Sequence, residues 1–276
     1  MARRGAEPKQ AVVVERKAAE GSVRALIRAL QILKRFDSER PSWSLAELSR
    51  SVELHKATTR RLVKTLESEG FLQADPDSGE FRLGSALLPL TYLARSQDHL
   101  VRVAHPHLER LAEASGETAT LSIWTEGGIL LVDHVLTNHY FKPALMPGRT
   151  TSEYGTTHSK ILLAFGTHDR LARMSLGDSG RPITLAEVEK IHDELKSVRE
   201  SGIAFDSERY RGVSAVAVPV RDSSAEVVAS LSLVMPTDRY TKERRSVFAG
   251  LVREAGANLS RDLGFRGPPA VLVGER

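Results

Sequence analysis

Apolar residues recur at helical spacing near the start of the chain, so residues 23–36 are predicted to form an amphipathic helix. A second helix is predicted from Ser44, because Ser44 and Glu47 have the spacing of a capping box, in which each side chain binds the other residue's backbone amide. After a brief turn at residues 53–55, a third helix is predicted to run to Gly70, since glycine suits the left-handed conformation that ends helices. The predicted core face of the first helix consists of Val23, Leu26, Ile27, Leu30 and Leu33.

A β-hairpin is predicted directly after the third helix. Residues 71–73 and 81–83 alternate as short strands do, and the segment between them contains Pro76 and Gly79, which favour chain reversal. Three helices followed by a hairpin is the order of a winged helix-turn-helix, whose last helix lies in the DNA major groove.

The third predicted helix has a positive outward face. The stretch from Leu54 to Leu66 contains basic side chains and no acidic one. Taken alone, such a face is more often a solvated charged surface, but the capped helix, the Gly70 stop and the hairpin in this order favour DNA binding. Arginine and lysine can hold phosphates or guanines, and threonine hydroxyls supply neutral groups for base edges. The predicted DNA-contacting residues are Lys56, Thr58, Thr59, Arg60 and Arg61 in the major groove, with Lys64 and Arg82 on or near phosphates.

The charge distribution supports a polyanion-binding module in the first third of the chain. Of 276 residues, the first 84 hold 16 Lys and Arg against 12 Asp and Glu, and the remainder holds 23 of each. The first 84 residues therefore hold the whole net charge of +4, and the longer remainder of the chain is neutral. The length itself predicts about two domains.

Composition excludes several classes of protein. Without cysteine the chain can form no disulfide, thiolate nucleophile or Cys-ligated metal site. Apolar runs fall short of the roughly 18 residues that a membrane span requires, and the apolar residues 11–14 are too few for a signal-peptide core of about 7–15 residues. We therefore expect a soluble, cytoplasmic protein that does not contact membranes.

The second part of the chain is predicted to be α+β. A second capping box at Thr184 and Glu187 opens a helix that Gly202 closes, and a last helix is predicted over residues 241–263. Strands are predicted over residues 118–124, 129–136, 215–220 and 227–234. Strands, then a helix, then strands again favour an α+β domain.

Two short motifs allow a catalytic or a metal-binding interpretation, and each has a simpler explanation. Residues 177–180, Gly-Asp-Ser-Gly, match a fragment of the trypsin-like protease signature, but a polar loop of small residues explains them and no secretory context accompanies them. His105 and His107 lack the i, i+4 pairing of a helical zinc site. We expect no metal, no cofactor and no enzymatic activity; a metabolite-binding protein or enzyme without DNA binding is the alternative from another class.

Several motifs in the chain resemble the IclR family of bacterial transcriptional regulators. LAELSRSVELHKATTRRLVKTLESEGF, beginning at Leu45, resembles the family's helix-turn-helix, and FRLG resembles the end of its wing. HPHLERLAEASGETATLSI, with Gly116-Glu117-Thr118 as signature, resembles the segment leading to the first sensing strand, and GIAFDSERYRGVSAVAVPVRD resembles a later stretch. The resemblance extends from about Ser22 to Leu263.

The resemblance implies a DNA-binding domain, a linker helix and an effector-binding α/β domain on a curved antiparallel sheet, similar to GAF and PAS domains. The expected parts are a flexible tail (1–21), a winged helix-turn-helix (22–84), the linker helix (85–98), the effector-binding domain (99–264) and a second flexible tail (265–276).

The resemblance also implies where a small organic acid or related metabolite would bind, between the sheet and the loop that opens a helix at residues 154–160. The implied effector-binding residues are Gly155, Thr156, Thr157, Asp206, Ala215, Ser230 and Ser232. Ser159 stands where the family has Gly, and Ala215 and Val234 replace the Cys and Ser of members that bind a very small acid, which favours a larger or more apolar effector. Two interpretations are open for four apolar residues: they form an apolar wall of the effector site, or they pack in the core. These residues are Tyr140, Phe141, Leu145 and Met146.

Family resemblance further implies a ligand-responsive repressor, with an activator as the alternative. One winged helix is a small interface, so we expect a homodimer that reads an inverted repeat in double-stranded operator DNA, or a dimer of such dimers. The apolar residues of the predicted linker helix favour its participation in the dimer contact.

Overall fold

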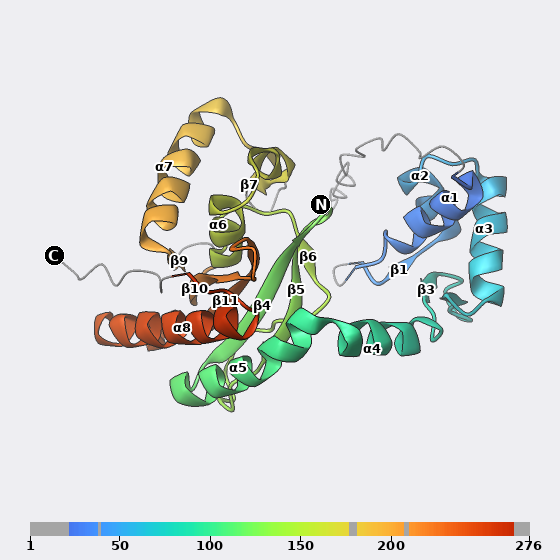
Figure 1. Cartoon of the computed structure of the whole chain (residues 1–276). Helices are drawn as coiled ribbons and strands as arrows, with labels where there is room; N and C mark the ends of the chain where they lie inside the picture. Colours follow the sequence, from blue (N-terminus) through green and yellow to red (C-terminus); the bar gives the residue numbers. More distant parts are fainter. Residues whose placement is uncertain (1–21, 38–39, 177–180, 207–209, 268–276) are drawn as a thin grey trace, which may run out of the picture. The chain divides into compact units, whose positions relative to one another are not determined.

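The computed structural model describes residues 22–37, 40–176, 181–206 and 210–267 and divides the chain into two compact units, Met1–Arg95 and Ser96–Arg276 (Figure 1). The sequence motif at residues 177–180 lies outside the described residues. Among those that are described, none of the helices combines the length and apolar character that crossing a membrane requires.

The first unit contains the three predicted helices, α1 (Arg24–Leu33), α2 (Leu45–Ser51) and α3 (Lys56–Ser68). The capping box at the start of α2 is present: the Glu47 amide donates to Ser44 Oγ over 3.3 Å, and the Ser44 amide donates to Glu47 Oε2 over 3.1 Å. Gly70 follows α3 with a φ of 73°, in the left-handed region. The three helices enclose a small core of Ile32, Leu48, Val52, Val63, Leu66 and Leu72.

The wing is a three-stranded antiparallel sheet rather than a two-stranded hairpin. The predicted strands are β2 (Leu72–Ala74) and β3 (Phe81–Leu83), and β1 (Ser42–Trp43) pairs with the free edge of β3. Asp75 organises the tip, where its carboxylate accepts the amides of Asp77 and Ser78 over 3.0 and 2.9 Å. These hydrogen bonds lower the pKa of Asp75.

The core face predicted for α1 is correct at Leu33, which packs against the core, and wrong at most of the other positions. Val23, Leu26 and Leu30 are 63%, 58% and 47% exposed, whereas Ile32 is completely buried. The periodicity correctly identifies an apolar face, but the first unit buries α1 mainly through residues at its C-terminal end. Among the residues of this unit that the structure describes, none covers the apolar face of the first two turns.

The second unit is built on a six-stranded antiparallel sheet with the order β6-β5-β4-β11-β10-β9. Its central strands are β4 (Thr118–Thr125), β10 (Val213–Arg221) and β11 (Val227–Pro236), and β5 (Gly128–Val135) pairs with β4. The short edge strands β6 (Thr150–Thr151) and β9 (Ala204–Asp206) were not predicted, because two or three residues carry too little alternation to be recognised.

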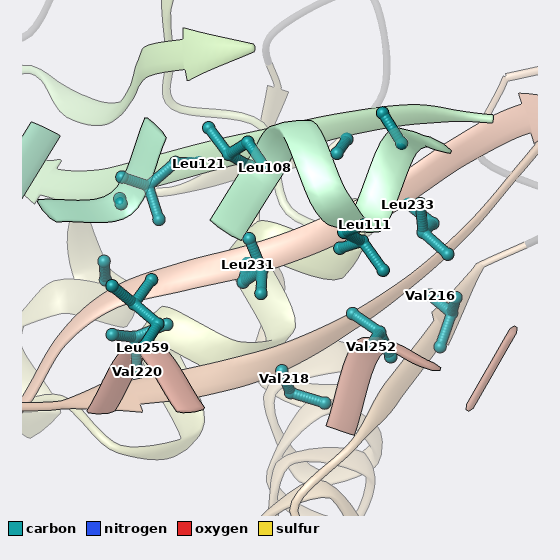
Figure 2. Packing of buried hydrophobic residues seen from close by; sticks show 14 of the residues in the cluster. Leu108, Leu111, Leu121, Val216, Val218, Val220, Leu231, Leu233, Val252 and Leu259 are labelled. Atoms are coloured by element: carbon teal, nitrogen blue, oxygen red, sulfur yellow. The ribbon is translucent and has the colours of Figure 1, made fainter. Parts of the chain in front are cut away.

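Helices cover both faces of this sheet (Figure 1). One face packs against α5 (His99–Ser115) and α8 (Lys242–Asp262), and Leu108, Leu231 and Val252 meet in the apolar layer shown in Figure 2. The other face packs against α6 (Thr157–Ala164), and α7 (Leu185–Ser201) packs on α6. The remaining elements are two 3-10 helices (His168–Arg173 and Thr237–Arg239) and the pair β7 (Ser175–Leu176) and β8 (Arg181–Pro182).

A buried ion pair explains the Gly116-Glu117-Thr118 motif. Gly116 has a φ of 71° and ends α5. The Glu117 carboxylate, fully buried, receives two hydrogen bonds of 2.7 Å from Arg239, and this pairing raises the pKa of Arg239. Thr118 Oγ1 accepts the Thr137 amide over 3.2 Å. The motif therefore fixes the turn from α5 into the sheet.

The helix α4 (Leu87–Gln97) is present close to the predicted linker position and contains the division between the two units. Four of its large apolar side chains are exposed, namely Leu88, Leu90, Tyr92 and Leu93.

Replacing the α2 cap should destabilise the first unit. Ser44→Ala removes the acceptor for the Glu47 amide and should lower the free energy of unfolding by about 1 kcal/mol. The chain has two tryptophans, so in a Trp124→Phe background the fluorescence of Trp43, next to the cap, reports urea unfolding of this unit. Ser44→Thr retains a capping hydroxyl and is the control; equal losses for both variants would contradict the capping role.

Candidate functional site

The outward side of α3 is a basic surface. Lys56, Arg60, Arg61 and Lys64 are all exposed, and their spacing places the last three on one continuous side of the helix. The opposite side, through Val63 and Leu66, is anchored in the core of the first unit. The helix therefore presents long cationic side chains from a fixed backbone.

Thr59 does not belong to this basic surface, contrary to prediction. It is completely buried, and its hydroxyl lies 3.4 Å from the carbonyl oxygen of His55. Its position in the helix faces Val63 and Leu66, so it cannot reach a base edge. Thr58 is partly exposed. Two residues that the sequence did not single out are also exposed: Ala57, next to Lys56, and Thr65, next to Lys64.

Arg82 lies on a second element of the same unit. It is exposed on β3, opposite Gln73 of β2 and Ser42 of β1. The wing thus contributes one cation in addition to those of α3.

In the second unit, the loop before α6 folds back on its own helix. Thr156 caps α6 by accepting the Ser159 amide over 3.1 Å, and the Ser159 hydroxyl accepts the Gly155 amide over 3.0 Å. Ser159 is fully buried, so the residue that departs from the family's glycine closes this turn locally. The amides of Thr157 and His158, in the first turn, have no intrahelical acceptor and suit an anion.

The sheet face below α6 is lined by buried hydroxyl groups. Ser232 is paired with Ala217 on one side and Thr120 on the other, and Ser230 is paired with Pro219 and Ser122. Directly opposed residues in antiparallel strands share a face, so these side chains form neighbouring rows under the helix. The buried hydroxyl residues of this face and of α6 are Thr118, Thr120, Ser122, Thr157, Ser159, Ser230 and Ser232.

His158 lies between α6 and this face, and the sequence analysis did not include it among the effector-binding residues. Its Nε2 is 2.9 Å from Thr120 Oγ1, and its Nδ1 is 2.9 Å from Ser230 Oγ. Thr157 Oγ1 lies 3.4 Å from Ser232 Oγ beside it. Burial lowers the pKa of His158 from its ordinary value of 6.5 to about 4. The imidazole is therefore neutral at physiological pH.

The remaining predicted effector residues lie on a neighbouring row. Ala215 is paired with Asp206 on one side and Val234 on the other, and Thr118 completes the row. Ala215 and Val234 therefore give this row an apolar middle between Asp206 and Thr118, while the next row contains the hydroxyl groups of Ser232 and Thr120.

Of the seven predicted effector positions, Thr157 meets Ser232 across the two elements, and Ser230 meets His158 of α6. Ala215 and Asp206 lie side by side in the neighbouring row. Gly155 and Thr156 make their contacts within the loop and the first turn of α6.

The helix α6 is fixed by a polar contact to its neighbours. Lys160 Nζ lies 2.7 Å from Glu194 of α7 and donates to the carbonyl oxygen of Phe205 over 3.0 Å. The Tyr154 hydroxyl also donates to Glu194, whose carboxylate raises the Tyr154 pKa in addition to the effect of burial. Lys160 is thus engaged away from the hydroxyl-lined face.

The residues considered as an apolar wall do not pack there. Tyr140, Phe141 and Met146 are exposed in the segment between β5 and β6, and Leu145 is partly buried. The three exposed side chains therefore neither form an apolar wall of the effector site nor pack in the core.

The histidines of the His-Pro-His segment have acidic partners. His105 Nδ1 lies 2.7 Å from the buried Asp133 of β5, and His107 Nε2 lies 2.8 Å from Asp262 of α8. These pairs join α5 to its neighbours, which gives both side chains a structural role.

Two family models match the chain over most of its length. The model described as the IclR helix-turn-helix domain matches residues 25–76, and the model described as the C-terminal part of the bacterial transcriptional regulator IclR matches residues 92–261.

Individual proteins agree with these matches. The DNA-binding transcriptional repressor YiaJ of Escherichia coli is 30% identical, with 87% of this chain and 88% of YiaJ covered. An IclR-type regulator structure from Silicibacter sp. TM1040 is 25% identical with a TM-score of 0.76, over 89% of this chain and 98% of that one. An IclR homologue from Microbacterium hydrocarbonoxydans, crystallised with 4-hydroxybenzoate, has the same fold, with 23% identity and a TM-score of 0.69 over 87% and 98% of the two chains.

The depressed pKa of His158 predicts a pH-dependent stability. Between pH 6.5 and about 4 the unfolded chain binds a proton on this side chain and the folded chain does not, so stability should fall as the pH falls through this range. His158→Gln should show a smaller loss of melting temperature between pH 7.5 and 4.5 than the unmodified protein.

The comparison isolates His158, because the other charged or titratable groups near it remain in both proteins. These are His134 and Asp206 on the sheet and Lys160 and Glu194 on α6 and α7. Parallel pH profiles for the two proteins would contradict a neutral, partly buried His158.

Proposed function

The chain belongs to the IclR family of bacterial transcriptional regulators. We propose that it represses transcription by binding operator DNA through α3. A small organic acid or related effector would control this binding. The observation that carries the DNA-binding part is the exposed basic side of α3, which contains no acidic residue between Leu54 and Leu66. Its four cations are presented by a helix whose other side is buried, as recognition of a major groove requires.

We assign two roles to the cations of α3 and of the wing. Lys56, Thr58, Arg60 and Arg61 would enter the major groove, where arginine can pair with guanine edges. Lys64 and Arg82 would contact phosphates. The first unit would supply DNA binding over residues 22–84, α4 would connect, and residues 99–264 would bind the effector.

The hydroxyl-lined face under α6 is the proposed effector site. Two amides at the start of α6 favour a carboxylate, and the buried hydroxyl groups of β4 and β11 favour further polar groups. The homologue of the same fold that was crystallised with 4-hydroxybenzoate supports an organic acid as the class of ligand.

Repression is favoured because YiaJ, the 30% identical relative, is a repressor. Activation remains the alternative, and a transcription assay on the bound promoter separates the two. Since the relatives are transcriptional regulators, we assign no enzymatic activity, and we assign the protein to the cytoplasm, where operator DNA is located.

A homodimer is proposed because two exposed apolar surfaces lie on α1 and α4. Val23, Leu26 and Leu30 form the first, and the side chains of α4 around Leu90 and Tyr92 form the second. Contiguous apolar patches of this kind mark protein contacts. A second copy of the chain would cover them and place two α3 helices on the halves of an inverted repeat; two dimers could pair on longer operators.

Loss of Arg60 should weaken operator binding. Arg60→Ala should weaken binding to operator DNA found by genomic selection by about 1–3 kcal/mol, which raises the Kd roughly 5- to 150-fold, since it removes a base contact. Lys64→Ala should weaken all DNA sequences alike and reduce the slope of log K against log salt by about one. Arg173→Ala, which removes an exposed cation from the second unit, is the control. An unchanged Kd for Arg60→Ala would remove α3 from the interface.

Charges placed on α1 should disrupt the dimer. Leu26→Glu combined with Leu30→Glu introduces four carboxylates into a symmetric contact and should shift sedimentation from dimer to monomer at micromolar concentration, because burying unpaired charge is costly. Leu136→Glu, at an exposed apolar residue next to β5, is the matched control. If the double variant sediments like the parent protein, α1 is not part of the dimer contact.

A further inference from the structure

His55 stands directly before the first residue of α3, and its side chain caps this helix. The Nδ1 atom accepts the backbone amide of Ala57 over 3.3 Å, an amide that has no acceptor within the helix. The side chain is also exposed. The imidazole therefore lies at the end of the same helix that carries the basic surface, in contact with its first turn.

The capping bond determines which nitrogen of the ring carries the hydrogen. A backbone amide can only donate, so Nδ1 must be the nitrogen without a hydrogen, and the hydrogen of the neutral imidazole lies on Nε2. Within the part of the chain that the structure describes, no group accepts a hydrogen bond from Nε2 of His55. The ring thus offers one donor and no acceptor to a molecule that approaches this end of α3.

The backbone that carries this ring is held by hydrogen bonds on both sides. The carbonyl oxygen of His55 accepts the Thr59 amide over 3.1 Å and the Thr59 hydroxyl over 3.4 Å. In the turn before it, the Leu54 amide donates to the carbonyl oxygen of Ser49 over 3.0 Å, and the Ser49 hydroxyl donates to the carbonyl oxygen of Leu54. His55 therefore presents its donor from a fixed turn, and buried Thr59 helps to fix it.

The first residues of a recognition helix are the ones that contact base edges in a helix-turn-helix. At this end of α3 three consecutive residues are exposed, namely His55, Lys56 and Ala57. Lysine is a compact charge on a flexible stem, and the alanine side chain has no hydrogen-bonding group. Of these three side chains, His55 alone offers a donor whose direction is fixed by a second hydrogen bond.

A single donor of fixed direction distinguishes the four bases in the major groove. Guanine presents two acceptors, N7 and O6, and no donor. Adenine has one acceptor beside a donating amino group, thymine has one acceptor beside a methyl group, and cytosine has only a donor. The hydrogen on Nε2 of His55 therefore has two possible acceptors on guanine and none on cytosine.

We propose that His55 is a specificity-determining residue of the DNA interface and that it selects guanine at one base pair of each operator half-site. Its Nε2 would donate to N7 or O6 of that base. This inference rests on the proposed function, in which α3 lies in the major groove. The cap and the base contact use different nitrogens of the ring, so both form at once.

The test removes the base contact and retains the cap. His55→Ser keeps a capping oxygen, and its side chain is too short to replace Nε2. Fluorescence anisotropy of the full-length proteins is measured on operator DNA found by genomic selection and on each single-base-pair substitution, made symmetrically in both half-sites. At one guanine the parent protein should lose about three- to tenfold in affinity on substitution, the effect of one hydrogen bond. His55→Ser should bind all four bases there within about twofold.

A merely structural role of His55 would not give this result. Loss of the cap would disturb the start of α3 and change the preferences at several base pairs, whereas loss of one donor changes the preference at one. His55→Asp caps the helix with a charged acceptor. It should weaken all sequences by repelling phosphates and should also lose the guanine preference, so it serves if His55→Ser does not fold. His139→Ser, at an exposed histidine of the second unit, should retain the profile of the parent protein.

The outcomes separate this inference from the proposed function. Parallel base preferences of the parent protein and His55→Ser, or a lost preference at a base other than guanine, would overturn the role of His55 while salt-dependent, selective operator binding remains. Absence of selective DNA binding by the parent protein would overturn the proposed function and this inference with it.

Discussion

The central strands of the large sheet are buried on both faces, and this constraint determines what the second unit can contain. Alternate residues of β4 and β11 point to α5 and α8, where Leu121, Leu231 and Leu233 form a dry layer (Figure 2). The intervening residues point to α6, yet several of them are serine or threonine. A buried hydroxyl needs a hydrogen-bonding partner. The first turn of α6 supplies partners through Thr157 and His158, so the same contacts that hold the helix on the sheet also define a polar site.

Local sequence signals predicted the ends of helices well, because the hydrogen bonds that define these ends join residues a few positions apart. The Ser44–Glu47 box, the Gly70 and Gly202 helix ends and the Thr241 start of α8 depend on neighbours in the chain, and each occupies its predicted position. The two-residue strand β1 could not be predicted in this way, because its pairing with β3 joins residues that are about 40 positions apart. Short edge strands owe their existence to the sheet they join.

Burial was harder to predict than secondary structure. The apolar spacing of α1 identified a face without showing what covers it, and the first unit leaves that face exposed. Thr59 was misassigned for the opposite reason: it lies among basic residues in sequence, but a helix turns it by 100° per residue onto the side of Val63. Both errors arise because a linear pattern contains no information about which other segment lies opposite. His158 was missed similarly, since its partners Thr120 and Ser230 come from distant strands.

The two units differ in the kind of electrostatics they use. The basic side of α3 relies on exposed full charges, which attract a polyanion from a distance and are screened by salt. At the α6 site, Lys160 forms an ion pair with Glu194. The other polar groups there are neutral hydroxyl groups, an imidazole and backbone amides, which interact only at contact distance. In the proposed function, the charges of α3 attract DNA, and a small acid would be recognised at the α6 site by hydrogen bonds at contact distance. An effector bound there can change DNA binding only by having different affinities for different arrangements of the chain. Because α4 contains the division between the units, such a difference must act through this helix or through the contacts made by its exposed apolar side chains.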